Sequence, residues 1–280
     1  MNRRQVFRLA ALPVLAAVPL TTLPRVGRAQ AARFITVSST TSTEDSGLFG
    51  HILPLFRAQT GIEVRVVAVG TGQALAIGAR GDADALLVHD RPGENKFVAD
   101  GNGVDRRDVM FNDFVIIGPK RDPANVSGGR DATIALKAIA SAGAAFVSRG
   151  DDSGTNRMEL RLWKAAGVEP RGLAYKELGQ GMGPTLNATA AMDGYTLTDR
   201  ATWANFKNRQ GLAILVEGDP ALLNPYGSIL VNPARFPHVK AADAAIWHGW
   251  LTSAPGQSAI TSFRIGGEQL FFLPPKPPVG

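Results

Sequence analysis

The fold of this chain is decided by residues 34–88, which read FITVSSTTSTEDSGLFGHILPLFRAQTGIEVRVVAVGTGQALAIGARGDADALLV. Short apolar runs rich in β-branched residues predict strands, and longer stretches with apolar residues on one face predict helices. The expected elements alternate: strand 34–38, helix 45–58, strand 63–69, helix 73–80 and strand 85–88. This alternation predicts an α/β fold in which helices cover both faces of a parallel sheet.

The alternation restarts after the apolar run Phe114–Gly118, which is typical of a buried strand and is followed by Pro119 and Pro123. Further strands and helices are expected at 131–142, 144–148, 153–166, 172–177, 184–192, 195–198, 200–208, 228–231 and 241–252. The run at 228–231 returns the chain to the first unit. We therefore predict two αβ lobes joined by two crossings: lobe 1 from 32–113 plus 228–280, and lobe 2 from 114–227.

The first 31 residues have the order of a signal peptide. Arg3 and Arg4 precede a short apolar run at 9–20, and a small-residue cleavage site lies near Ala29 or Ala31. The arginine pair fits the twin-arginine variant of such signals. The apolar run is too short for the roughly 20 residues of a membrane-spanning helix. The sequence therefore predicts export to the periplasm and cleavage of residues 1–31.

The composition excludes several classes of function. Residues 1–31 carry five arginines and no acidic residue, so the formal charge of +6 falls to +1 without them. The basic character thus belongs to the export signal, and nucleic-acid binding loses its support. The chain has no cysteine. That excludes disulfides, thiolate metal sites, cysteine nucleophiles and a lipid-modified cysteine anchor.

Three loops rich in Ser, Thr and Gly each follow an expected strand and precede an expected helix. The first, Ser38–Thr43, has six consecutive hydroxyl side chains, whereas capping a helix requires only one. Hydroxyls beside free backbone N–H groups at a helix start suit an anion. The second, Gly70–Thr71–Gly72, begins like a dinucleotide-binding fingerprint but has Leu75 at its third glycine position. It is either an ordinary turn or an anion contact.

The third loop, residues 148–156, reads SRGDDSGTN. Ser153 is expected to cap a helix, while Gly154 and Thr155 offer N–H groups and a hydroxyl. Arg149 can present two parallel N–H donors to an oxyanion, and Asp151 can hold that guanidinium in place. The competing interpretation is a surface Arg–Asp pair beside a capped helix. Three such loops in one chain favour an anion site.

The chemistry of catalysis is missing from these loops. The four histidines have no metal-ligand spacing, and neither Gly-x-Ser-x-Gly nor Gly-Lys-Ser/Thr occurs. A hydrolase needs a base beside a nucleophile, so this class is disfavoured. Among the histidines, His89 alone follows a buried-strand pattern, where sheet ends meet a ligand-binding cleft.

At this point the chain is recognisable. It resembles the periplasmic tungstate-binding proteins along residues 34–265, in the segments Thr40–Leu48, Gly81–His89, Asn112–Pro119, Ser148–Asn156 and Tyr195–Arg200. The resemblance implies a two-lobed type II periplasmic-binding-protein fold with the ligand between the lobes. Ser39 stands where that family has the first threonine of its Thr-Thr-Thr-Ser loop. Related phosphate-binding proteins share the Arg-x-Asp-x-Ser-Gly-Thr pattern at 149–155, where the arginine and helix start bind the anion and the aspartate braces the arginine.

The predicted function is capture of tungstate, with molybdate possible as a second ligand, for an ABC importer made of a permease and an ATPase. The oxyanion-binding residues are expected to be Ser39, Thr40, Thr41, Ser42, Thr71, Arg149, Ser153, Gly154 and Thr155. Asp151 and His89 are expected to stand behind them, with His89 placed where the phosphate-binding proteins have a proton-accepting carboxylate. No catalysis, cofactor, metal cation or nucleic-acid partner is expected, and the protein is expected to be a monomer. Two alternatives stay open: a receptor for phosphate or sulfate, and an oxyanion-sensing subunit that transports nothing.

Overall fold

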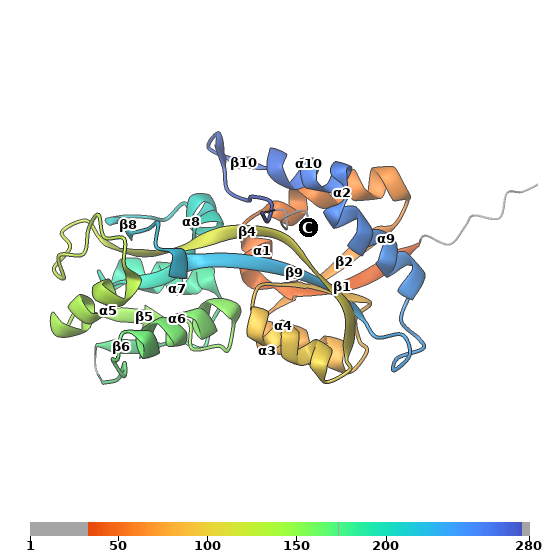
Figure 1. Ribbon diagram of the computed structural model, residues 1–280. Coiled ribbons are helices and arrows are strands. Elements are labelled where there is room, and N and C mark those ends of the chain that lie inside the picture. Colours follow the sequence, from red (N-terminus) through yellow and green to blue (C-terminus); the bar gives the residue numbers. More distant parts are fainter. Residues whose placement is uncertain (1–32, 173, 276–280) are drawn as a thin grey trace, which may run out of the picture. The chain divides into compact units, whose positions relative to one another are not determined.

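The structure is a computed structural model that describes residues 33–172 and 174–275. The predicted signal segment, residues 1–31, lies outside the described residues (Figure 1). The first part of the chain contains β1 (Phe34–Thr40), α1 (Thr41–Asp45), α2 (Leu48–Thr60), β2 (Glu63–Val69), α3 (Thr71–Ala79), β3 (Ala85–Val88), α4 (Arg91–Ala99) and β4 (Gly103–Pro119). The middle contains α5 (Ala132–Ser141), β5 (Phe146–Ser148), α6 (Gly154–Ala165), β6 (Tyr175–Glu177), α7 (Met182–Ala191), β7 (Thr196–Asp199), α8 (Arg200–Asn205) and β8 (Leu212–Val216). The last part contains a 3₁₀ turn (Pro220–Leu222), β9 (Leu223–Val231), α9 (Ala241–Thr252), α10 (Ala254–Ser262), β10 (Arg264–Ile265) and β11 (Glu268–Gln269).

The parallel pairing predicted for residues 34–88 is confirmed. Strand β1 pairs in parallel with β2 on one side and with β3 on the other. Beyond β3 the sheet becomes mixed, because β9 returns antiparallel to β3 and β4 runs antiparallel to β9. The full order is β2-β1-β3-β9-β4-β7, with β8 also paired to β4. The ends of β1 and β3 therefore lie side by side, which brings the residues that follow them together.

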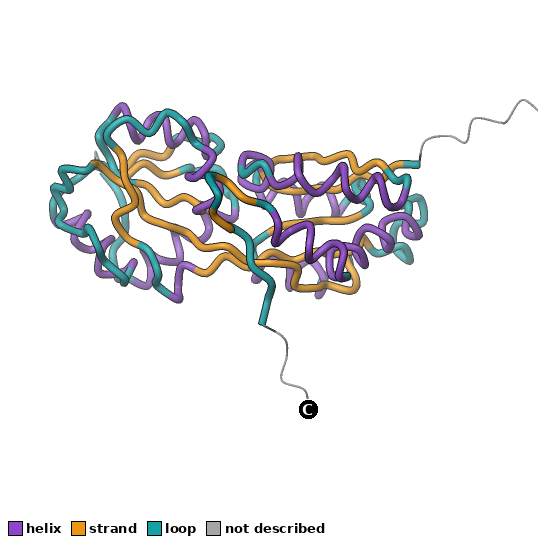
Figure 2. Tube along the Cα trace, turned by 90° about the horizontal axis from the view of Figure 1, so that it is seen from above, coloured by secondary structure: helices purple, strands orange, loops and turns teal. Residues whose placement is uncertain are grey.

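Two strands, β4 and β9, pass from one lobe into the other (Figures 1 and 2). They pair from Gly103 opposite Val231 to Asp113 opposite Leu223. The second half of β4 then pairs with β7 and β8. Both predicted lobe boundaries, 113/114 and 227/228, fall inside these continuous strands. The lobes are thus joined by hydrogen-bonded strands rather than by loose linkers.

Each lobe has a hydrophobic core of its own. In the first, Trp247 of α9 is fully buried and packs edge-on against Phe56 of α2, with ring centroids 5.0 Å apart. In the second, Phe146 of β5 packs edge-on against Trp163 of α6 at 5.1 Å. Such pairs stabilise beyond the area that they bury. The elements that carry the loops at the lobe boundary are therefore packed on two separate cores.

The helix predicted at 45–58 is wrong at its start, because α2 begins at Leu48 and the residues before it form a separate short helix, α1, divided from α2. The division falls at Gly47, whose φ of +82° suits glycine and ends the first turn of helix. As a result the hydroxyl run does not form an open loop. Its first residues complete β1, and α1 begins directly after Thr40, whose side chain accepts a hydrogen bond from the backbone N–H of Thr43.

Candidate functional site

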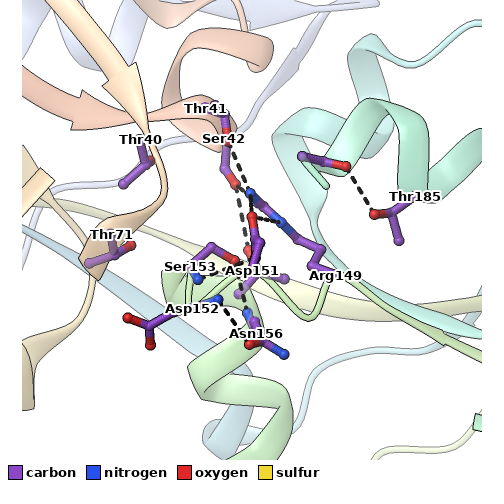
Figure 3. Close-up of polar contacts among 12 residues, drawn as sticks. Thr40, Thr41, Ser42, Thr71, Arg149, Asp151, Asp152, Ser153, Asn156 and Thr185 are labelled. Atoms are coloured by element: carbon purple, nitrogen blue, oxygen red, sulfur yellow. Dashed lines mark hydrogen bonds and ion pairs between the residues drawn. The ribbon is translucent and has the colours of Figure 1, made fainter. Parts of the chain in front are cut away.

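Arg149 lies at the meeting point of the two lobes. It follows β5 in the second lobe, and only 1% of its surface is exposed. Its guanidinium reaches α1 of the first lobe, where Nη1 donates to Ser42 Oγ at 2.8 Å and Nη2 donates to Thr41 Oγ1 at 3.0 Å (Figure 3). A buried cation thus contacts two hydroxyls that each keep a proton to donate. This is a cluster of donors with a single fixed positive charge.

Asp151 holds the guanidinium in this orientation. Its Oδ2 accepts from Arg149 Nη2 at 2.6 Å and from Nε at 3.2 Å, and its Oδ1 accepts from the backbone N–H of Ser153. The carboxylate therefore ties the arginine to the start of α6. An arginine held in this way loses little further side-chain entropy when it binds a ligand.

The start of α6 faces the same place. Ser153 caps the helix by accepting from the backbone N–H of Asn156, and Gly154 N donates to Thr71 Oγ1 of the first lobe at 2.6 Å. Thr155 Oγ1 lies 3.5 Å from Ser42 Oγ. A 12-residue helix has a partial positive charge at this end, which favours an anion. The structure thus brings Thr41, Ser42, Thr71, Arg149 and the 153–155 segment together.

Gly154 is required for the lobes to approach. A Cβ atom on this residue would lie 2.8 Å from His89 Cε1 and 3.0 Å from Thr71 Oγ1. Contacts this short are forced apart by repulsion, so any larger residue separates the two lobes locally. The sequence alone identified Gly154 only as an N–H donor.

Ser39 and Thr40 have other hydrogen-bond partners. Ser39 Oγ donates to the carbonyl of Leu87 on β3 at 2.6 Å, which joins two neighbouring strands. Thr40 Oγ1 lies 3.1 Å from His89 Nε2 and 2.7 Å from Thr43 Oγ1. Both predicted ligand residues are buried and point into the first lobe rather than toward Arg149.

Replacing Ser39 with alanine is therefore expected to lower the free energy of unfolding without weakening anion binding. The lost hydroxyl leaves the carbonyl of Leu87 without its side-chain donor, which costs about 1 kcal/mol. Urea denaturation measures the first effect and calorimetric titration the second. A large loss of affinity in Ser39→Ala would place this hydroxyl on the ligand.

His89 is a buried, neutral histidine. Its Nδ1 lies 3.0 Å from Asn224 Oδ1, and burial together with the nearby charge of Arg149 lowers its pKa to about 4. The ring therefore carries no charge at neutral pH. His89 directly follows β3, as predicted from the sequence. It contacts Thr40, the residue that precedes Thr41 and Ser42.

This lowered pKa makes stability depend on pH. Unfolded His89 binds a proton near pH 6.5, whereas the folded protein resists protonation down to about 4. The contribution to stability is complete above pH 6.5 and is lost as the pH falls toward 4, a difference on the order of 3 kcal/mol. Unfolding curves of the wild type and of His89→Gln between pH 4 and 7 measure it. We expect the wild type to lose more stability than the variant, and equal losses would contradict this account.

A second set of charges joins the lobes at the edge of the site. Asp90, only 2% exposed, follows His89 in the first lobe and accepts from Arg157 Nη1 at 2.7 Å and from Arg161 Nη1 at 2.9 Å. Both arginines belong to α6. Arg157 also donates to Asp152, so one guanidinium connects residues of both lobes. The sequence did not reveal this cluster, because its members are 67 and 71 residues apart.

Among residues 33–172 and 174–275, no helix has the length and apolar character needed to cross a membrane. The same residues contain no group of three or more His, Asp or Glu side chains arranged to hold a metal ion.

Comparisons with known proteins agree on one family. Residues 27–255 match the model of a PBP superfamily domain. The tungstate-binding protein TupA of Peptoclostridium acidaminophilum is 45% identical over 240 residues, which cover 85% of this chain and 84% of that protein. The solved tungstate ABC transporter protein of Geobacter sulfurreducens is 50% identical with a TM-score of 0.78, covering 84% of this chain and all of that one. TupA of Desulfovibrio alaskensis G20 is 44% identical with a TM-score of 0.74, covering 88% of this chain and all of that one. This chain therefore belongs to the PBP superfamily and, within it, to the tungstate-binding proteins of ABC transporters.

Proposed function

We propose that this protein captures tungstate between its two lobes and delivers it to an ABC importer, without catalysing a reaction. The observation that carries the proposal is the reach of Arg149 across the lobe boundary to Thr41 and Ser42. A buried cation, hydroxyls from the facing lobe and the start of α6 form a site of hydrogen-bond donors. Such a site suits a tetrahedral dianion that has four acceptor oxygens and no proton.

The surroundings of His89 favour an oxyanion without a proton over phosphate. Near neutral pH phosphate carries a hydrogen, which needs an acceptor in its binding site. Both ring nitrogens of His89 are already engaged, one with Thr40 and the other with Asn224. Asp151 is occupied by the guanidinium and by Ser153 N. Phosphate would thus bring a donor to a site in which neither His89 nor Asp151 is free to accept it, and a donor left unpaired costs about 1–3 kcal/mol.

Sulfate is also unprotonated at neutral pH, and it differs from tungstate in size. Its shorter bonds place its oxygens closer to the central atom, so hydroxyls held on two rigid lobes cannot all reach them. Each unmade contact costs about 1–3 kcal/mol. Molybdate has almost the same size as tungstate and is proposed as a second ligand. The names of the relatives support tungstate as the principal one.

The proposed location is the periplasm, after cleavage of the signal segment at residues 1–31. The importer is proposed to consist of a membrane permease and an ATPase, which receive the ligand from the closed form. The predicted charge of the mature protein, +1, is close to zero. Binding of the dianion then depends on the local donors rather than on attraction by the whole surface.

Isothermal calorimetry of the cleaved protein tests the proposal. We expect tight binding of tungstate, weaker or equal binding of molybdate, and no competition from sulfate or phosphate at a hundredfold excess. Phosphate or sulfate binding in the absence of tungstate binding would contradict the proposal.

A further inference from the structure

A continuous chain of buried hydrogen bonds connects α1 with the end of β7. It joins six side chains, none of them more than 4% exposed. In order, the contacts are Thr43 Oγ1 to Thr40 Oγ1 (2.7 Å), Thr40 Oγ1 to His89 Nε2 (3.1 Å), His89 Nδ1 to Asn224 Oδ1 (3.0 Å), Asn224 Nδ2 to Asn112 Oδ1 (2.7 Å) and Asn112 Nδ2 to Asp199 Oδ1 (3.2 Å). Hereafter we call this set the hinge chain.

The hinge chain passes between the lobes along the two crossing strands. Asn112 on β4 and Asn224 on β9 are direct partners in the antiparallel pairing of those strands. On one side they lead to His89, at the end of β3 in the first lobe. On the other they lead to Asp199, at the end of β7 in the second lobe. Any change in the angle between the lobes must bend β4 and β9 close to these amides.

One backbone group fixes the direction of every hydrogen bond in the hinge chain. The N–H of Thr202 donates to Asp199 Oδ1 at 2.9 Å, so this oxygen is an acceptor. Asn112 must therefore present its amide nitrogen to Asp199 and its oxygen to Asn224. By the same reasoning Asn224 turns its nitrogen to Asn112 and its oxygen to His89.

His89 must then carry its proton on Nδ1 and leave Nε2 as an acceptor, since the partner of one ring nitrogen decides the role of the other. Thr40 consequently donates its hydroxyl proton to Nε2. The oxygen of Thr40 accepts from the backbone N–H of Thr43 and from the Thr43 hydroxyl. Thr40 thus has no proton left for a ligand.

The second lobe also holds α1 by a shorter route. Thr202 Oγ1 of α8 donates to the carbonyl of Ser42 at 3.2 Å, and Asn205 Nδ2 donates to the carbonyl of Asp45 at 2.8 Å. Helix α1 is therefore fixed at Thr40 and Thr43 through the hinge chain and at Ser42 and Asp45 through α8. Between these points lie the hydroxyls that contact Arg149.

We propose that the hinge chain positions the donor hydroxyls of Thr41 and Ser42. Their position then depends on the angle between the two lobes, because the chain runs along the strands that set this angle. This proposal rests on the proposed oxyanion function of the same site. Its members are positioning residues: they set where α1 lies and do not touch the ligand. Thr40, expected from sequence to be a ligand residue, belongs to this set.

The tautomer of His89 is the first test, and it requires neither a variant nor a ligand. In ¹⁵N-labelled wild-type protein at neutral pH, long-range ¹H–¹⁵N spectra should show a protonated Nδ1 and an unprotonated Nε2 for His89. His51, which is partly exposed and bonded to Ser262, provides a second ring in the same spectrum for comparison. A proton on Nε2, or on both nitrogens, would overturn the direction assigned to the hinge chain. This result is independent of whether the protein binds tungstate.

The second test compares tungstate affinities. In Asn224→Asp the new carboxylate cannot donate to Asn112, and we expect affinity to fall about tenfold, the equivalent of one buried hydrogen bond. Asn208→Asp, which adds the same charge at an exposed loop, is the matched control and should bind normally. Thr40→Val should show a similar loss, which Thr40→Ser should restore because it keeps the hydroxyl. Unchanged affinity in both Asn224→Asp and Thr40→Val, or no recovery in Thr40→Ser, would overturn the positioning role.

Discussion

Replacing Arg149 with lysine is expected to weaken tungstate binding by about a hundredfold, because lysine keeps the charge but loses the several charge-assisted hydrogen bonds of the guanidinium. The guanidinium contacts Thr41, Ser42 and Asp151 through three separate nitrogens. A lysine ammonium is a single point of charge and cannot reproduce that planar set of donors. Calorimetric titration of tungstate into the wild type and Arg149→Lys measures the difference.

The matched control is Arg121→Lys. Arg121 also pairs with an aspartate, Asp193, but both side chains are exposed and distant in sequence from the site loops. Exposed pairs contribute little, so this variant should bind tungstate like the wild type. Near-normal affinity of Arg149→Lys would remove Arg149 from the ligand site and with it the main support for the function proposed above.

Replacing Asp90 with alanine is expected to weaken tungstate binding by about thirtyfold, mainly by faster release. Asp90 is buried at the lobe boundary and holds Arg157 and Arg161 of the opposite lobe. Without it the two cations of α6 lose their carboxylate partner in the first lobe, and the closed form loses about 2 kcal/mol relative to the open form. Because both arginines are partly exposed, this figure lies below that for a fully buried pair.

Stopped-flow measurement of tungstate release tests this expectation, and small-angle scattering of the ligand-free protein reports how far the lobes are open. The control is Asp193→Ala, which removes an exposed ion pair within the second lobe. A reduced association rate with unchanged release would mean that Asp90 acts on the approach of the anion and not on closure.

Much of the site was predictable because its residues cluster in sequence. Arg149, Asp151 and Ser153 stand in one segment, and the chemistry of each side chain indicates its role. The βαβ pattern of residues 34–88 likewise predicted parallel strands, which the structure confirms for β1, β2 and β3. Local sequence is informative where one short loop supplies several parts of the site.

Contacts between distant segments were not predictable in this way. Asn112 and Asn224 become neighbours only because β4 and β9 pair antiparallel, and residues 103–113 were not predicted as strand. That segment contains Asp105, Arg106, Arg107 and Asp108, whose charges hide the alternation of a half-buried strand. The hydroxyl run, in contrast, led us to predict more ligand residues than the structure brings to Arg149. Four of its residues, Ser39 to Ser42, were expected to bind the ligand, but Ser39 bonds to Leu87 and Thr40 to His89 within the first lobe.

The central claim is that a proton-free tetrahedral dianion binds between Arg149 and the hydroxyls of the facing lobe. The most direct measurement is a crystal structure of the cleaved protein grown with tungstate, with diffraction collected at an absorption edge of tungsten. We predict a single strong anomalous peak that marks one tungsten atom. The oxygens of this tungstate ion should lie within hydrogen-bonding distance of Arg149, Thr41, Ser42 and Thr155. A tungsten peak elsewhere on the protein, with these four side chains still bonded only to one another, would contradict the account.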